Sequence, residues 1–334
     1  MPQIANGKFI VLGGASQVGT TIAEQLLAAG AHEVVLLDNL LLGSMATLQP
    51  LLSDPRCRFI RGDVLRLNEL YDAFAGADGV FAVAAYMASS IGENPWAGID
   101  VNIRGVQNTL EACRYRGVKK VVLSSSAGVY GALVDDPTDE DSPLRWQAMP
   151  PAVALYCASK VMGEGLARLY RQQHGLDFAA LRYSAVYGER QHRRALVGGH
   201  IADTCRRVRE GLRPIIQGDG RQAHDYLHAG DAARANLLAM EGPVSGESFN
   251  ICSGETASQQ WVVETVLRAC GSNLEPEYRD QRGAGTFPAT PSHATSLDKA
   301  RRLLGWEPQV SLEEGIRRVL RWVDEERASG YVPH

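Results

Sequence analysis

The sequence predicts an α/β fold: a Rossmann-type doubly wound parallel sheet with a smaller C-terminal α/β lobe. Three observations support this prediction. Short apolar runs alternate with helical patterns through the first half of the chain, a glycine-rich turn joins the first run to the first helix, and the alternation loosens past the middle. Strand and helix units in series imply right-handed crossovers and a parallel sheet that is covered on both faces.

The first half of the chain supplies strands and helices in alternation. Lys8–Leu12 is a short apolar run, typical of a buried parallel strand. Beyond the glycine turn, apolar residues recur at helical spacing from Ile22 to Leu27, and Gly30 is typical of a helix C-terminus. The further strands that we expect are Val34–Leu37, Cys57–Ile60, Gly79–Val83 and Val118–Ser124, and the further helices are Leu65–Phe74 and Ile99–Arg116.

The second half is expected to hold more helices than strands. Leu155–His174 is typical of one long helix and Asp177–Arg182 of a strand. Gly211–Gly220 and Pro243–Gly254 are rich in turn residues, so we expect turns there. The further helical stretches are Asp231–Met240, Ser258–Cys270, Leu297–Leu304 and Leu312–Glu326.

The length of 334 residues allows one large α/β domain and a smaller one. We assign residues 1–180 to the Rossmann domain, which later segments rejoin, and residues 181–334 mainly to a substrate lobe. A net charge of −4 gives no basic surplus of the kind that binds nucleic acid. No apolar run approaches the roughly 20 residues of a membrane span, and the N-terminus lacks the apolar stretch of a signal peptide.

The six cysteines are scattered and form no C-x-x-C pair. In a chain of this length that pattern indicates reduced thiols and neither a disulfide framework nor a zinc site. We therefore expect a cytoplasmic protein that acts on a small molecule, with no metal and no nucleic-acid or membrane partner.

The turn Gly13-Gly14-Ala15-Ser16-Gln17-Val18-Gly19 lies between a strand and a helix, where a dinucleotide pyrophosphate meets backbone N–H groups. Its spacing is G-x-x-G-x-x-G with Ser16 in the middle place. A serine adds a Cβ where a glycine allows close approach, so we expect its hydroxyl to donate a hydrogen bond to the ligand. The alternative is a glycine-rich turn that binds nothing.

Asp38 ends the second strand, 19 residues after Gly19. An acid in this place hydrogen-bonds the ribose 2′-OH of NAD and repels the 2′-phosphate of NADP, so the sequence favours NAD. The alternative is a solvated loop acid. Gly62-Asp63-Val64 follows the third strand and is placed to hold the adenine edge.

Three serines, Ser124 to Ser126, follow a strand whose carboxyl end faces the ligand crevice. Tyr156 and Lys160 are four residues apart, so they share one face of a helix. An ammonium beside a phenol lowers the pKa of the tyrosine and favours the phenolate. A phenolate can take the proton of an alcohol while hydride leaves the same carbon, and a serine can hold that alcohol.

With these motifs the chain resembles the extended short-chain dehydrogenase/reductase family, in the branch of nucleotide-sugar epimerases and dehydratases that includes UDP-glucose 4-epimerase-like enzymes. The matching segments span nearly the whole chain in the order of the family. They include VLGGASQVG, RGDV, VVLSSSAGVYG, YCASKVMGE, LRYSAVYGERQ and GDGRQAHDYLHAGDAARANLLAM.

The resemblance implies roles for the matched positions. Ser126, Tyr156 and Lys160 would be the catalytic residues. The long helices 99–116 and 155–174 would pack against the same helices of a second copy in a homodimer. Substrate contacts would come from Ser126, Tyr156, Ala185, Arg190 and His224. NAD would be bound by Gly13, Ser16, Gln17, Val18, Gly19, Asp38, Asn39, Asp63, Val64, Val83, Ala84, Ala85, Asn102, Ser124, Tyr156, Lys160 and Tyr183.

Departures from the family pattern bear on the reaction and the substrate. Ala127 and Gly128 follow Ser126 where dehydratases of this branch carry Asp-Glu, which disfavours a dehydratase. Ala185 replaces an asparagine, His224 replaces an arginine, and only Arg282-Gly283 remains of an Arg-Gly-Asp signature that commonly helps to hold the sugar-nucleotide diphosphate.

We therefore expect an NAD-dependent sugar epimerase that acts through a transient keto intermediate, on a nucleotide sugar and at C4. One alternative is an NAD-dependent dehydrogenase or ketoreductase of a non-nucleotide polyol or hydroxy acid. A second alternative is an NAD-binding protein without catalytic activity.

Overall fold

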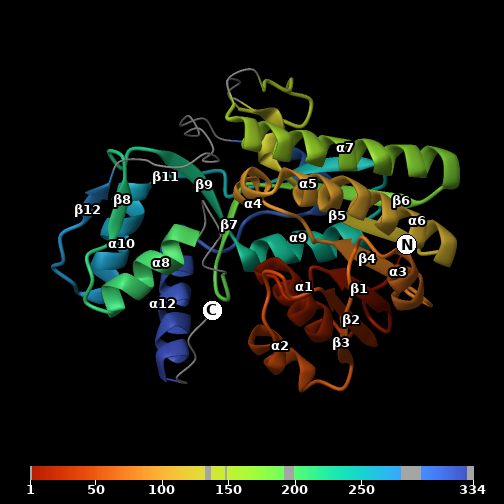
Figure 1. Ribbon diagram of the computed structural model, residues 1–334, viewed down its shortest axis with the longest axis horizontal. Coiled ribbons are helices and arrows are strands. Elements are labelled where there is room, and N and C mark those ends of the chain that lie inside the picture. The colour runs from red at the N-terminus through yellow and green to blue at the C-terminus, as the bar shows by residue number, and fades with distance from the viewer. Residues whose placement is uncertain (1, 132–136, 147–148, 192–198, 280–294, 329–334) are drawn as a thin grey trace.

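A computed structural model describes residues 2–131, 137–146, 149–191, 199–279 and 295–328 (Figure 1). Its main body is a seven-stranded sheet in which every neighbouring pair is parallel, as the sequence predicts. The strand order is β10-β6-β5-β4-β1-β2-β3. The strands are β1 Lys8–Leu12, β2 Glu33–Asp38, β3 Cys57–Arg61, β4 Gly79–Ala82, β5 Lys120–Ser126, β6 Asp177–Tyr183 and β10 Glu247–Ile251.

Helices cover both faces of this sheet. The inner strands are apolar on both sides, so successive residues enter opposite cores: Val11 packs with the first group of helices and Ile10 with the second. The first group consists of α1 Gln17–Ala28, α2 Met45–Leu52, α9 Ala229–Glu241 and α11 Asp298–Leu304. The second consists of α3 Leu67–Ala73, α6 Val106–Arg116 and α7 Pro151–His174.

The segment expected to be one helix over Ile99–Arg116 is instead built of three pieces. These are α5 Pro95–Ile99, a π-helix Asp100–Gly105 and α6, preceded by the short α4 Ala88–Glu93. The side chain of Asn102, inside the π-helix, hydrogen-bonds the backbone of Tyr86 and the hydroxyl of Ser159. The π-helix therefore contains a side chain that is held by contacts with distant residues. The spacing of apolar residues does not predict such contacts.

Two segments expected to be turns contain strands. Pro243–Gly254 includes β10, which joins the main sheet beside β6. Its polar residues Ser248 and Asn250 are buried and hydrogen-bonded. The sequence of this strand is therefore not a continuous apolar run, which is the pattern used to predict buried strands. Gly211–Gly220 includes the short β8 Ile215–Gln217.

A second lobe contains a three-stranded sheet of β7 Ala185–Tyr187, β9 Ala223–His228 and β11 Thr256–Ser258. β8 pairs with β12 Glu277–Arg279. The helices of the lobe are α8 Gly199–Arg209, α10 Gln259–Cys270 and α12 Leu312–Ala328.

The two lobes lie side by side in Figure 1, with β7 and β9 between them. α9, β10 and α11 return to the first sheet, as expected for late segments. β6 ends at Tyr183 and β7 begins at Ala185, so the carboxyl end of the main sheet opens toward the second lobe.

None of the helices in the described part of the chain is both long enough and apolar enough to span a bilayer. The described residues also contain no cluster of three or more His, Cys, Asp or Glu side chains that could hold a metal ion.

Candidate active site

The glycine turn leads from β1 into α1. Gly13 has a φ of 74°, and a Cβ on it would lie 2.8 Å from the backbone nitrogen of Ala84. This close approach to the end of β4 requires a glycine. Ser16 is the N-cap of α1: its hydroxyl accepts a hydrogen bond from the N–H of Gly19 at 3.1 Å and donates one to the carbonyl of Gly13 at 2.6 Å.

The expected donation from Ser16 to a ligand is therefore not what the structure shows, because the hydroxyl proton is used inside the loop. The backbone N–H groups of Gln17 and Val18 have no hydrogen-bond acceptor among the described residues. They lie in the first turn of a 12-residue helix, where N–H groups have no partner within the helix. These two groups and the positive end of the helix dipole fit a dinucleotide pyrophosphate.

Asp38 lies at the end of β2, against this loop. Its carboxylate accepts hydrogen bonds from the N–H groups of Ala15 at 3.0 Å and Leu40 at 2.8 Å. Burial raises the pKa of Asp38, and the two hydrogen bonds oppose that effect. Asn39 donates to the carboxylate of Asp63 at 3.4 Å. Asp38, Asn39 and Asp63 thus gather at one edge of the sheet, the arrangement expected for an adenosine site.

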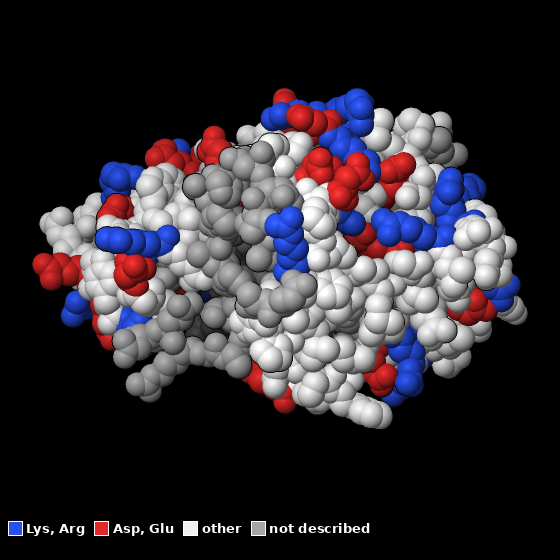
Figure 2. All heavy atoms as spheres, turned by 90° about the horizontal axis from the view of Figure 1, so that it is seen from above, with Lys and Arg blue, Asp and Glu red and all other residues white. Residues whose placement is uncertain are grey.

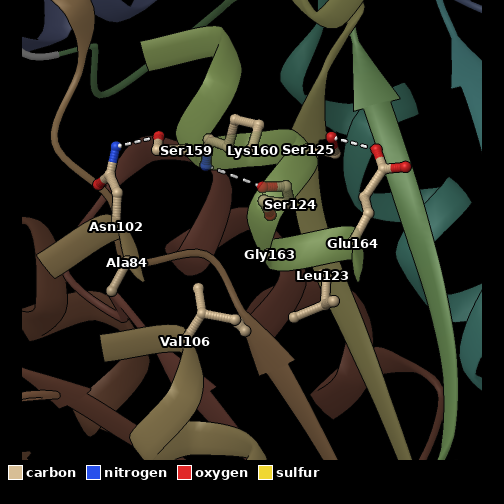
Figure 3. A pocket seen from close by; sticks show the side chains of 11 residues that line it. Ala84, Asn102, Val106, Leu123, Ser124, Ser125, Ser159, Lys160, Gly163 and Glu164 are labelled. Carbon is tan, nitrogen blue, oxygen red and sulfur yellow. Dashed lines mark hydrogen bonds between the residues drawn. The ribbon is translucent and has the colours of Figure 1, made fainter. Parts of the chain in front are cut away.

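Ser126, Tyr156 and Lys160 come together where β5 ends beside α7. Tyr156 is buried and hydrogen-bonded to the Ser126 side chain. The Lys160 ammonium donates to the carbonyl of Ser124 at 2.9 Å (Figure 3). It lies 5.5 Å from the centre of the Tyr156 ring. Ser126 at the end of β5 therefore lies beside Tyr156 and Lys160, which share one face of α7.

The expected lowering of the Tyr156 pKa is wrong for the structure described. Burial raises the pKa of Tyr156 well above its usual range, although the Ser126 hydrogen bond opposes this. Burial also lowers the pKa of Lys160 to about 8. The largest cause of the raised Tyr156 pKa is the loss of solvation on burial, which outweighs the Ser126 hydrogen bond. The Lys160 ammonium donates to the Ser124 carbonyl and lies 5.5 Å from the centre of the Tyr156 ring.

A small cavity lies between the ends of β4 and β5 and the helices α6 and α7. Asn102 lines it, but its amide holds protein groups: it accepts from the N–H of Tyr86 at 2.7 Å and donates to the Ser159 hydroxyl at 3.1 Å. Asn102 therefore holds the cavity wall, and its contact with NAD stays a prediction. The lining residues are Ala82, Ala84, Asn102, Val106, Leu123, Ser124, Ser125, Ser159, Lys160, Gly163 and Glu164 (Figure 3).

The other residues expected to bind the cofactor follow the ends of β3 and β4. Val83 and Ala84 donate their N–H groups to the carbonyl of Leu12, both at 3.0 Å, which fixes the end of β4 against β1. Ala85 follows them and is half-buried. The carbonyl of Val64, which is buried, accepts from the Asn108 side chain at 2.9 Å.

Tyr183 is the register partner of Ser126 and has its hydroxyl on the opposite face of the sheet from α7. This hydroxyl accepts a hydrogen bond from Asn236 of α9 at 2.7 Å, and burial raises the pKa of Tyr183 to about 12. The Tyr183 ring therefore packs in the core between the sheet and α9, and its hydroxyl is hydrogen-bonded to another protein side chain.

The residues expected to bind substrate are divided in the structure. Ala185 begins β7 and is half-buried. His224 is the second residue of β9 and lies half-buried beside the ring of Tyr226. Burial lowers its pKa to about 4, so it is neutral near pH 7. The Arg190 guanidinium makes two hydrogen bonds of 2.6 Å with Glu24 of α1, and its contact with a substrate stays a prediction. Arg282 and Gly283 lie outside the described residues.

The sequence analysis missed Glu164, Arg182 and His200. Glu164 lines the cavity one helical turn beyond Lys160 and forms a buried ion pair with Arg182 at 2.8 Å. The four-residue step from Lys160 to Glu164 was the available signal. His200 lies in the first turn of α8, and its ring forms a hydrogen bond of 2.7 Å with the Tyr226 hydroxyl. These two residues are 26 positions apart, so no local sequence pattern indicates the contact.

Comparison with known families gives an independent assignment. The model of the NAD dependent epimerase/dehydratase family matches residues 9–252, which is most of the chain. The chain belongs to the NAD dependent epimerase/dehydratase family. The family and the fold expected from the sequence are thereby confirmed, and so is the expectation of an NAD-dependent enzyme of this class.

Three relatives of the family illustrate the range of names. A putative UDP-glucose 4-epimerase of Methanocaldococcus jannaschii is 32% identical over 94% of this chain and 97% of its own length. A dTDP-glucose 4,6-dehydratase of Streptomyces niveus is 28% identical over 96% of this chain and 94% of its own length. The solved structure of Thermus thermophilus UDP-glucose 4-epimerase in complex with NAD is 31% identical, with a TM-score of 0.83. The match covers 95% of this chain and 99% of the chain of that structure.

We expect the protein to bind NAD⁺ at least about tenfold more tightly than NADP⁺, because the Asp38 carboxylate would repel a 2′-phosphate at a few ångströms. Asp38→Asn should narrow this preference by removing the charge while keeping the size of the side chain. Calorimetric titration of both cofactors measures the ratio. Asp78→Asn, at the opposite end of the sheet, is the matched control. Equal affinities in the unaltered protein would contradict the assignment of Asp38.

Proposed function

We propose that this protein is an NAD-dependent epimerase that inverts C4 of a nucleotide sugar through a transient 4-keto intermediate. The observation that carries the proposal is the grouping of Ser126, Tyr156 and Lys160 beside a nucleotide loop, with no carboxylate directly after Ser126. Ala127 begins a 3₁₀ turn, Ala127–Tyr130, and supplies no acid or base for the loss of water.

The three residues have separate roles in this proposal. NAD⁺, when bound, would supply a hydride acceptor and donor for the sugar carbon and a positive charge on its nicotinamide. Tyr156 takes the proton of the C4 hydroxyl and gives it back, and Ser126, already hydrogen-bonded to Tyr156, holds the sugar oxygen. Lys160 holds the carbonyl end of β5 and places a positive charge beside the Tyr156 ring. Because burial disfavours the phenolate, proton removal depends on these positive charges.

One observation favours the second candidate, a dehydrogenase or ketoreductase of a non-nucleotide polyol or hydroxy acid. Arg190 is paired with Glu24, and His224 is neutral near pH 7, so neither offers a cation to a diphosphate. The names of the relatives, which are nucleotide-sugar enzymes, support the first candidate.

Turnover with UDP-, GDP- and dTDP-hexoses, and then with free sugars and polyols, tests the proposal. We expect a C4 epimer with no net growth of the NADH absorbance, because the hydride returns to the same carbon. Stoichiometric NADH with a stable ketone or acid would instead establish the dehydrogenase. A 4-keto-6-deoxy product would establish a dehydratase.

Tyr156→Phe should lower turnover by about 10²- to 10⁴-fold, because it removes the proposed base while the ring still packs. NAD⁺ affinity, measured by fluorescence, should stay within about twofold, since the phenol oxygen is not part of the pyrophosphate site. Tyr170→Phe, on the same helix, is the control. Substantial turnover in a folded Tyr156→Phe variant would overturn the role of Tyr156.

The protein is also proposed to be a homodimer. Leu155, Met162 and Leu169 of α7 are spaced seven residues apart and are 43%, 49% and 44% exposed. Ala158 and Gly165 lie between them, and a Cβ on Gly165 would meet open space. Figure 2, which views the molecule from above, shows an expanse of uncharged surface beside clusters of charged side chains. Apolar residues that repeat every seven positions, with small residues between them, can pack closely against the same helix of a second copy.

The reduced state of the cysteines supports the proposed cytoplasmic location, since all six are free thiols.

Met162→Glu should convert the dimer to a monomer, because it places a charge in the centre of the proposed apolar contact. Light scattering at micromolar concentration measures the mass. Met45→Glu is the matched control, since Met45 is 38% exposed on α2, a different helix. A monomeric unaltered protein, or an unchanged dimer in Met162→Glu, would contradict this interface.

A further inference from the structure

Glu164 is a buried acid to which the proposed reaction gives no role. It lies on α7, one helical turn beyond Lys160, and only 2% of its surface is exposed. It lines the same cavity as Lys160 and Ser124, on the side nearest β6 (Figure 3). A carboxylate so deeply buried is costly unless its oxygen atoms are all hydrogen-bonded.

The carboxylate of Glu164 joins three neighbouring strands, β5 and β6 near their carboxyl ends and β10 near its amino end. One oxygen, Oε1, accepts from the Ser125 hydroxyl at 2.6 Å and from Arg182 Nε at 3.0 Å. The other, Oε2, accepts from Arg182 at 2.8 Å and from the Ser248 hydroxyl at 2.8 Å. Ser125 and Arg182 are register partners on β5 and β6, and Ser248 lies on β10. Arg168, more exposed, lies 3.5 Å from Oε2.

Arg182 extends this network to the other side of Ser126. Its guanidinium donates to the Tyr130 hydroxyl at 2.8 Å, and that hydroxyl donates to the Asn250 side chain at 2.6 Å. Tyr130 ends the 3₁₀ turn that begins directly after Ser126. Ser126 is therefore held between two points, Ser125 before it and Tyr130 after it, and both are tied to the Glu164–Arg182 pair.

We propose that Glu164 is a positioning residue which, through Arg182 and Ser125, fixes Ser126 at the end of β5 against Tyr156 and Lys160 on α7. This inference rests on the roles proposed above for those three residues. Glu164 and Lys160 belong to one helix, while Ser125 and Ser126 belong to one strand. The ion pair thus sets the distance and angle between the two elements on which the site is built.

Charge adds a second effect on Lys160. Although burial opposes it, hydrogen bonding to Arg182, Ser125 and Ser248 lowers the pKa of Glu164, so Glu164 is ionised near pH 7. Burial lowers the pKa of Lys160, whereas the Cys157 and Glu164 side chains raise it. Tyr156 is the other titratable group that faces the ammonium. Loss of the Glu164 charge should therefore lower the pH at which Lys160 loses its proton.

Two variants and one matched control test the proposal. Glu164→Gln removes the charge and keeps the shape. Glu164→Gln combined with Arg182→Met leaves no unpaired buried charge, so it provides a folded protein if the single variant is too unstable. The control is Glu326→Gln, which breaks another Glu–Arg pair of low exposure, Arg206–Glu326 at 3.2 Å between α8 and α12.

Two measurements are made on the full-length protein with NAD⁺. The first is the pH dependence of kcat and KM. The second is the titration midpoint of Lys160 by NMR of ¹³C-labelled lysine, which is practicable because the chain has five lysines. Lys160→Arg assigns the resonance.

We expect kcat to fall about 10- to 100-fold in the Glu164 variants, with NAD⁺ affinity within about twofold and the Lys160 midpoint lower by about one pH unit. Glu326→Gln should change the melting temperature alone. If the Glu164 variants are folded and keep both kcat and the Lys160 midpoint, the role of Glu164 is purely structural and the proposal is wrong. If the unaltered protein turns over no nucleotide sugar, the proposed function fails, and the Lys160 midpoint still decides the role of Glu164.

Discussion

The register of β5 against β6 is the constraint on which the site depends. It places Ser125 opposite Arg182 and Ser126 opposite Tyr183. Because successive side chains of a strand point to opposite faces, Ser125 donates its hydroxyl to Glu164 of α7, while Ser126, at the end of the strand, reaches Tyr156. A slip of one residue would turn Ser125 away from Glu164 and would move Ser126 away from Tyr156. The chemical groups and the network that holds them are therefore set by one ladder of backbone hydrogen bonds.

The sequence predicts those parts of the fold and the site that depend on local patterns. The strand, glycine turn and helix from Lys8 to Ala28 follow from an apolar run and helical periodicity, and Tyr156 and Lys160 follow from their spacing. The strand β10 could not be found in this way, because Ser248 and Asn250 are polar side chains that hydrogen-bond partners far away in the chain. Arg190 is similar: its partner Glu24 is 166 residues distant.

Burial acts in opposite directions on the two titratable residues of the site. It raises the pKa of Tyr156 and lowers that of Lys160, since in each case it disfavours the charged form. Near pH 7 the structure therefore holds a neutral phenol beside an ammonium whose pKa is about 8. Such a pair is a poor base by itself. The sequence could not reveal this, because spacing shows that two groups are close and does not show what else surrounds them.

The two lobes contribute differently to the site. The groups of the main sheet are fixed by strand ends and by the buried Glu164–Arg182 pair, whereas His200 on α8 and His224 on β9 of the second lobe are neutral near pH 7. The lobes are joined at the nucleotide loop itself: Gln17 donates to the carbonyl of Glu189 at 3.0 Å, and Glu24 pairs with Arg190. A cofactor on α1 and a substrate on the second lobe would thus be held by neighbouring segments. Under the proposed function, the sheet would hold the reacting groups, and the second lobe, tied to α1 by these contacts, would select the substrate.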